Sequence, residues 1–168
     1  MSTRSLSAFA ESLYARHGVR EACLQLQDGA GRDVTLLLAA VWLGCRGRMA
    51  GPAEWAAVDA ELAPWREGVV EPLRGVRRRL RERADGSEVE ALREQVKAAE
   101  LAAEFRALAW LEGRLAVVGV PSGPGVDAVA ANLAAVAGSA APAAALAALR
   151  GAAREAGCPA AGAPSTAP

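Results

Sequence analysis

Excess charge, long apolar runs and signal-like segments are all missing from this chain of 168 residues. Its 19 basic and 19 acidic side chains cancel, so no global field would draw it to nucleic acid or to a membrane. The most apolar stretch, Val34 to Cys45, is well short of the roughly 20 residues that span a bilayer. Charges at Arg4, Glu11 and Arg16 interrupt the N-terminus, so no signal peptide is predicted.

Metal-binding and disulfide-forming residues are scarce. Cys23, Cys45 and Cys158 are too few and too scattered for a disulfide framework or a zinc cluster, so we expect a reducing cytoplasm. The single histidine, His17, cannot supply the Glu-x-x-His pairs of carboxylate-bridged di-iron bundles. We therefore predict no metal and no cofactor.

Catalytic motifs are also missing. No serine, cysteine or lysine stands in a recognisable nucleophile motif, and neither common phosphate-binding glycine pattern is present. The glycine-rich GVPSGPG contains no lysine and is typical of a linker. We assign no catalytic residue, and an enzyme with a small acidic pocket near Asp28 and Asp33 is the least favoured of three function classes.

What the chain does have is helical periodicity. It predicts an all-α protein, a compact bundle of five or six helices over residues 5–116. Ser5 or Ser7 would cap the first helix, and Gly18 would end it as the C′ residue. Asp33 is expected to cap the helix of residues 34–45, which is apolar on nearly every side and should lie at the centre of the fold.

A long helical hairpin is predicted over residues 64–112. Pro64 and Pro72 favour a break or kink near residues 68–71, because proline is not tolerated in a helix interior. After a turn at Asp85-Gly86, Ser87 is expected to cap the second arm through a capping box with the glutamate three residues later.

Charged residues on this hairpin are the binding candidates: Arg74, Arg77, Arg78, Arg81, Glu100 and Glu104. The four arginines share one helical face, which suits phosphate oxygens if the guanidinium groups are free. The favoured alternative is pairing with the acidic arm. Arg81 should then lie near Glu90, and Arg77 near Glu94. Glu100 and Glu104 should face Arg74 or Arg66.

Composition changes after Val120. We predict a helical domain over residues 1–118, followed by an Ala/Pro/Gly-rich tail over 119–168 that is low in complexity and marginally helical or disordered. Alanine favours a helix but offers little side chain to bury.

Tryptophan outnumbers phenylalanine and tyrosine combined. Trp42 lies within the apolar helix and must belong to the core, whereas Trp55, Trp65 and Trp110 are candidate surface anchors. The predicted function is a non-enzymatic cytoplasmic module that binds another protein or itself. Binding of nucleic acid or an anionic ligand through Arg74 to Arg81 is the alternative, and no membrane partner is expected.

Three motifs carry a resemblance to a known family: CLQLQDGAGRDVTLLLAAVWLG, then WREGVVEPLRGVRRRLR, then KAAELAAE. Over about Leu6 to Leu111 the chain resembles a family of short proteobacterial proteins catalogued as a domain of unknown function. Thr35 and His17 stand where the family has asparagine and proline. The resemblance implies an α-helical cytoplasmic protein with a variable C-terminal region, no established activity and no catalytic residues.

Overall fold

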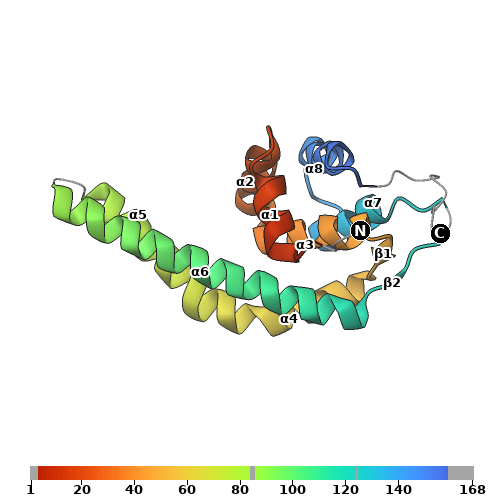
Figure 1. Cartoon of the computed structure of the whole chain (residues 1–168), viewed down its shortest axis with the longest axis horizontal. Coiled ribbons are helices and arrows are strands. Elements are labelled where there is room, and N and C mark those ends of the chain that lie inside the picture. Colours follow the sequence, from red (N-terminus) through yellow and green to blue (C-terminus); the bar gives the residue numbers. More distant parts are fainter. Residues whose placement is uncertain (1–3, 84–85, 124, 159–168) are drawn as a thin grey trace.

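The computed structural model describes residues 4–83, 86–123 and 125–158, which are almost entirely helical (Figure 1). The predicted all-α class is confirmed. The helices are α1 (Leu6–Tyr14), α2 (Val19–Ala30), α3 (Val34–Cys45), α4 (Pro52–Trp65), α5 (Glu71–Glu82), α6 (Ser87–Val118), α7 (Ala128–Ala137) and α8 (Ala143–Glu155). The two-residue strands β1 (Arg48–Met49) and β2 (Val120–Pro121) pair antiparallel, with Arg48 opposite Pro121.

The helix α3 is the centre of the fold, as its apolar sequence predicts. Every residue from Leu36 to Gly44 is buried, and α1, α2, α6, α7 and α8 all pack against it. Asp33 occupies the N-cap position, where its Oδ1 accepts a hydrogen bond from the backbone N–H of Thr35 at 2.7 Å. An all-round apolar helix is stable here because its neighbours surround it.

The link between α1 and α2 differs from the prediction. Ser5 caps α1, accepting a hydrogen bond from the backbone N–H of Ala8 at 3.3 Å. Gly18 is not the C′ residue of this helix, because α1 ends at Tyr14. Gly18 instead stands directly before α2 with φ 77°, a left-handed conformation that glycine adopts without a Cβ clash.

No break separates α4 from α5. A π-helical segment, Arg66–Val70, joins them at about the place where a break or kink was predicted. At its end the backbone N–H of Glu71 donates to the carbonyl of Arg66, five residues earlier. The wider π-helical turn adjusts the hydrogen-bond ladder ahead of Pro72, which lacks an N–H, so the helical path continues.

The second arm of the hairpin, α6, begins one position earlier than the capping box requires. Gly86 is at the N-cap and Ser87 is the first helical residue, so the prediction that Ser87 caps this helix is wrong by one position. The other predicted turn residue, Asp85, lies outside the described residues.

Residues 128–155 correct the prediction of a tail after residue 118. They form α7 and α8, and Leu133 and Leu149 belong to the same hydrophobic core as α3. A Cβ on Gly44 would lie 2.5 Å from the Cα of Val129, so glycine lets the backbones of α3 and α7 approach closely. The low-complexity pattern misled because small side chains bury well where backbones are this near. Residues 159–168 lie outside the described part.

Asn132 of α7 ties this helix to the β1 region. Its side chain is fully buried; its Oδ1 accepts from the backbone N–H of Ala50 at 3.0 Å, and its Nδ2 donates to the carbonyl of Arg48 at 2.9 Å. The indole N–H of Trp55 also donates to this Oδ1, at 3.4 Å. Trp55 is therefore a core residue and not a surface anchor.

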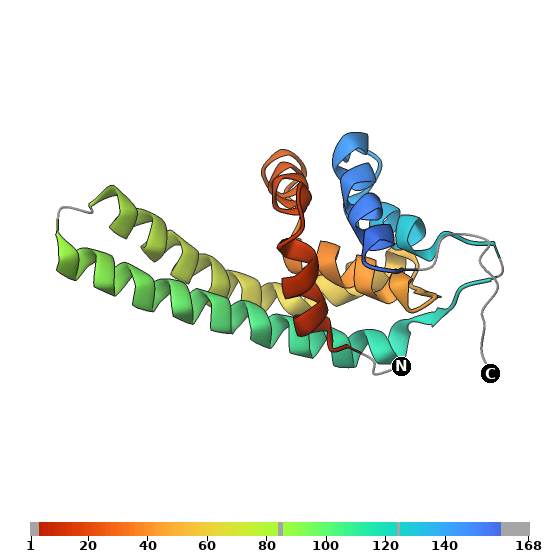
Figure 2. The same cartoon turned by 45° about the horizontal axis from the view of Figure 1, so that its top comes forward.

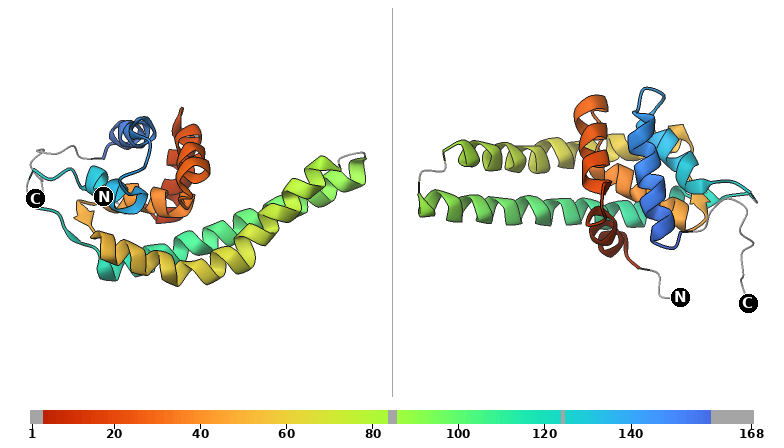
Figure 3. Two further views of the ribbon diagram at one scale, coloured as in Figure 1. Left: turned by 180° about the vertical axis from the view of Figure 1, so that it is seen from behind. Right: turned by 90° about the horizontal axis from the view of Figure 1, so that it is seen from above.

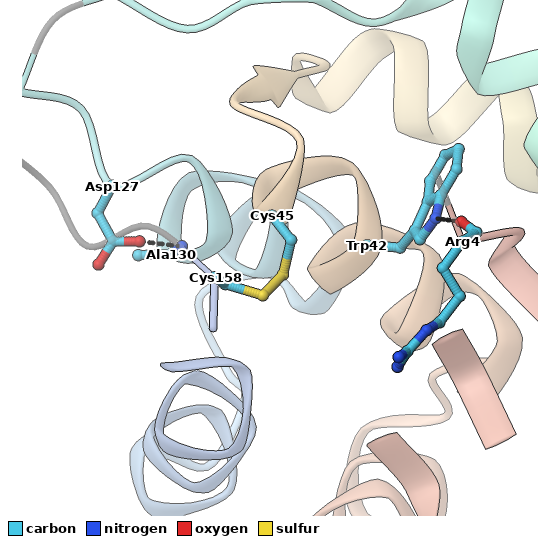
Figure 4. The surroundings of a disulfide bond; sticks show 6 residues. All are labelled: Arg4, Trp42, Cys45, Asp127, Ala130 and Cys158. Carbon is cyan, nitrogen blue, oxygen red and sulfur yellow. Dashed lines mark hydrogen bonds between the residues drawn. A yellow bond between two sulfur atoms is a disulfide. The ribbon is translucent and has the colours of Figure 1, made fainter. Parts of the chain in front are cut away.

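A disulfide bond joins Cys45, the last residue of α3, to Cys158 (Figure 4). Three scattered cysteines predicted no disulfide framework, but the fold pairs two of them, which are 113 positions apart in sequence. Cys23 stays free and buried, and burial raises the pKa of its thiol to about 12. A cytoplasmic location stays a prediction.

The described part of the chain contains a head and an arm. The head consists of α1, α2, α3, α7 and α8, and the arm consists of α5 with the part of α6 that packs along it. The arm projects well beyond the head (Figures 1 and 2) and curves toward the side on which α2 stands (Figure 3). No helix in the described part of the chain is both long and apolar enough to cross a membrane.

Candidate interaction groove

A groove with a volume of about 1200 Å³ lies between the head and the arm. Side chains from α1, α2 and the start of α3 line one wall, and side chains from α4, the π-helical segment, α5 and α6 line the other. The hairpin curves toward the side on which α2 stands (Figure 3), and the groove lies between them. It brings together most of the charged residues that the sequence nominates.

Four of those residues form one network across the hairpin. The Nε of Arg74 lies 3.1 Å from Oε1 of Glu100, and its Nη2 lies 2.8 Å from Oε1 of Glu104. Arg77 holds the same Glu100 through Nε to Oε2, and through Nη2 to Oε1 at 3.2 Å. Glu100 is buried, whereas both arginine side chains keep part of their surface in solvent. The network therefore binds α5 to α6 where no large apolar residue of α5 is buried.

Glu100 and Glu104 lie one helical turn apart, and their pKa values are shifted in opposite directions. Burial opposes ionisation of Glu100, but hydrogen bonds from Arg77 and Arg74 outweigh it and hold the pKa of Glu100 below its usual range. Burial raises the pKa of Glu104, and the single partner Arg74 offsets this only in part. The neighbouring carboxylates of Glu100 and Asp33 raise the pKa of Glu104 further.

A second cluster lies at the start of α3. Nη1 of Arg66 is 2.5 Å from Oδ1 of Asp59 and 3.3 Å from Oδ2 of Asp33. Oδ1 of Asp33 also accepts from the hydroxyl of Thr35 at 2.5 Å. Asp33 thus caps α3 with one oxygen and holds the π-helical segment with the other. Asp33 and Arg66, which this second contact joins, both line the groove.

Two predicted ion pairs are wrong. Glu90 pairs with Arg93 at 2.5 Å, and Glu94 pairs with Lys97 at 3.1 Å, instead of reaching Arg81 and Arg77 across the hairpin. The partner of Arg77 is Glu100, six positions further along α6 than the predicted Glu94. Counting symmetrically from the turn missed this offset, because the phase and relative shift of two packed helices depend on their whole interface.

The shared arginine face is therefore divided. Arg74 and Arg77 are engaged with carboxylates, whereas Arg78 and Arg81 are exposed and have no ion pair with a carboxylate in the described ranges. Arg78 lines the groove. The anion-binding interpretation requires free guanidinium groups at all four positions. The fold does not provide them, because Arg74 and Arg77 are paired with glutamates.

Apolar side chains exposed inside the groove were not nominated as a group from the sequence. They are Leu24 of α2, Trp65 at the end of α4, and Leu101 of α6, with 40%, 37% and 50% of their surface exposed. The indole N–H of Trp65 donates to the carbonyl of Ala103 at 3.0 Å, which fixes the ring. Leu101, Phe105 and Leu108 follow helical spacing along α6, and of these three only Leu108 is buried.

Within the described ranges, no three histidine, cysteine, aspartate or glutamate side chains gather in an arrangement that could hold a metal ion. Glu100 and Glu104 instead share Arg74, and His17 is exposed on the link between α1 and α2.

Fold and groove together define an all-helical protein with a charged, partly apolar concave surface. The chain belongs to the family described as "Protein of unknown function (DUF2390)", whose model matches residues 5–111. Neither the comparison with curated proteins nor that with solved structures gives a match. The matched segment includes every residue that lines the groove except Ala135 and Val136 of α7, whereas α8 and Cys158 lie beyond it.

Proposed function

We propose that the protein is a helical interaction module that binds a segment of a partner protein in the groove. The observation that carries this is the exposure of Leu24, Trp65 and Leu101 on one concave surface. Large apolar side chains that stay in water cost free energy, and where they gather in a concavity they mark binding sites. Tryptophan is enriched among the residues that anchor protein interfaces, and Trp65 is such a residue in the groove.

The geometry favours a helical ligand. Helices form both walls of the groove, with α2 on one side and the arm on the other, so an amphipathic helix can place its apolar face on Leu24 and Leu101. Around them the wall carries charges of both signs, including Arg78, Lys97 and Glu67. A partner helix with a mixed polar face would meet complementary groups along these edges.

Anion or nucleic-acid binding through Arg74 to Arg81 is less well supported. Arg74 and Arg77 already hold the buried Glu100, and releasing them for phosphate would leave that carboxylate uncompensated. The exposed Arg78 and Arg81 alone offer two charges on one helix. The groove, with its apolar contacts, is the better-supported site.

The test compares two leucines of α6. Leu101 lines the groove, whereas Leu92 does not, and the two are 50% and 49% exposed. They are nine residues, or two and a half turns, apart, so they lie on opposite sides of the helix. A photo-reactive amino acid at each position in the full chain, expressed in cells, should capture a partner from position 101 and not from position 92.

The captured partner is then purified and its affinity measured. Leu101→Asp should weaken binding by at least about tenfold, the equivalent of losing roughly 1.4 kcal/mol of apolar contact, and Leu92→Asp should leave it unchanged. Circular dichroism melts of both variants confirm folding. Equal capture from the two positions, or equal affinities of the two variants, would rule out the groove as the binding site.

A further inference from the structure

The disulfide bond between Cys45 and Cys158 lies at the C-terminal ends of α3 and α8. Cys158 is held at a defined place beyond α8: Gly157 has φ 85°, its N–H donates to the carbonyl of Arg154, and the N–H of Cys158 donates to Ala153. These two hydrogen bonds form a Schellman motif, the usual closure of a helix on a left-handed glycine. Cys158 therefore moves with α8, and the disulfide attaches the end of this helix to α3.

Non-covalent contacts hold α8 only modestly. Its buried residues are Ala145, Leu149, Ala152 and Ala153, of which leucine alone has a large side chain. Its ion pairs join Arg150 and Arg154 to Asp127 at 2.7 Å and 3.7 Å, and Glu155 to Arg16 at 3.6 Å, all between partly exposed side chains. Because so little apolar surface is buried, the covalent bond contributes a large share of what holds α8 in place.

The helix beneath α8 is α2, which also forms a wall of the groove. Packing contacts join α8 to α2 more extensively than to α3 or α7. On α2, Ala22 and Leu26 are buried, while Arg20, Leu24 and Gln27 line the groove. If α8 loosens, α2 loses part of the packing that holds it, and α2 is the groove wall that carries Leu24.

We infer that the Cys45–Cys158 disulfide is a reducible latch that holds α8 against α2 and so fixes one wall of the groove. A thiolate of a dithiol reductant attacks one sulfur of the bond, forms a mixed disulfide and releases the other cysteine as a thiolate, which takes up a proton. The second thiol of the reductant then displaces the protein sulfur. Two electrons pass to the protein, both cysteines end as thiols, and the reductant becomes a disulfide. The effect of this latch on partner binding rests on the proposed function. The attachment of α8 to α2 by the disulfide does not depend on that function.

Hydrogen exchange on the full chain tests the latch without any partner. Mass spectrometry first establishes that the purified protein carries the bond and that dithiothreitol adds two hydrogens. Reduction should then raise amide exchange by at least about tenfold in residues 143–155, and measurably in residues 19–30, while exchange in α6 stays unchanged. The Cys158→Ser variant should exchange like the reduced protein and should not respond to dithiothreitol.

Three results would overturn the inference. The first is free thiols at residues 45 and 158 in protein purified without reductant. The second is exchange in residues 143–155 or in residues 19–30 that does not change on reduction. The third is an equal response of the Cys158→Ser variant to dithiothreitol, which would place the effect elsewhere. Failure of partner binding to the groove would change none of these readouts, so the two proposals fail separately.

Discussion

Glu100 and Glu104 provide the sharpest test of how the groove is built, because the same substitution should act differently at the two positions. Both lie on α6, one turn apart, and both hydrogen-bond to Arg74. Only Glu100 also binds Arg77. Glutamine at either position keeps the size of the side chain and one acceptor oxygen but removes the charge.

The magnitude at Glu100 follows from its burial and its partners. Breaking a buried ion pair costs about 3–5 kcal/mol. Here the side chains of Arg74 and Arg77 remain 23% and 25% exposed, so they can turn toward water after the charge is lost. We therefore expect Glu100→Gln to lower the free energy of unfolding by about 2 kcal/mol, toward the value of a charged hydrogen bond. For a chain of this length this is a fall in Tm of about 4–8 °C.

The expectation at Glu104 is different. Burial is the largest influence on this carboxyl and raises its pKa, so the ionised form is disfavoured in the folded protein. Glutamine removes that penalty and still accepts a hydrogen bond from Arg74. The two changes offset each other, and Glu104→Gln should alter the free energy of unfolding by no more than about 0.5 kcal/mol at neutral pH.

The pH dependence supplies a second check. The lowered pKa of Glu100 stabilises the fold above its unfolded pKa, and this contribution is lost as the pH falls through the folded value. The raised pKa of Glu104 acts oppositely: its contribution is fully present below the unfolded pKa and is lost as the pH rises through the folded value. The deficit of Glu100→Gln should therefore shrink once the pH falls below about 4. Thermal melts followed by circular dichroism measure both effects. Equal losses for the two variants at pH 7 would refute this account of the network.

Two other substitutions test the hydrogen bonds that hold α7 and α3 in place. Asn132→Ala should lower the free energy of unfolding by about 3 kcal/mol, because the buried N–H of Ala50 and the carbonyl of Arg48 lose their partner. Urea denaturation measures this free energy, and a loss below about 1 kcal/mol would contradict the prediction. Asp33→Ala should lower the free energy of unfolding by about 1–2 kcal/mol, because it removes the cap of α3 and the contact to Arg66. Asp33→Asn still caps the helix and should lower the free energy of unfolding by less. Equal melts of the two Asp33 variants would assign the effect to charge alone.

Local features of this protein could be predicted from its sequence. The apolar residues 34–45 form the central helix, and Asp33 caps it, because a cap depends on residues within one turn of the chain. The prolines indicated a disturbance between α4 and α5, although not that it would be a π-helical turn. The prediction that Glu100 and Glu104 face Arg74 or Arg66 is confirmed for Arg74, which pairs with both, whereas Arg66 pairs with Asp33 and Asp59.

Features that join distant parts of the chain were decided by the tertiary structure alone. Cys45 and Cys158 meet only because α7 and α8 fold back onto α3, and nothing in their spacing indicates it. Leu101 belongs to an apolar stripe, but its exposure depends on how far the head extends along α6, and this leaves it in the groove. Periodicity reports which face of a helix is apolar. The sequence pattern does not show which neighbour covers that face or how two helices are offset. Both depend on packing between segments that are distant in the sequence.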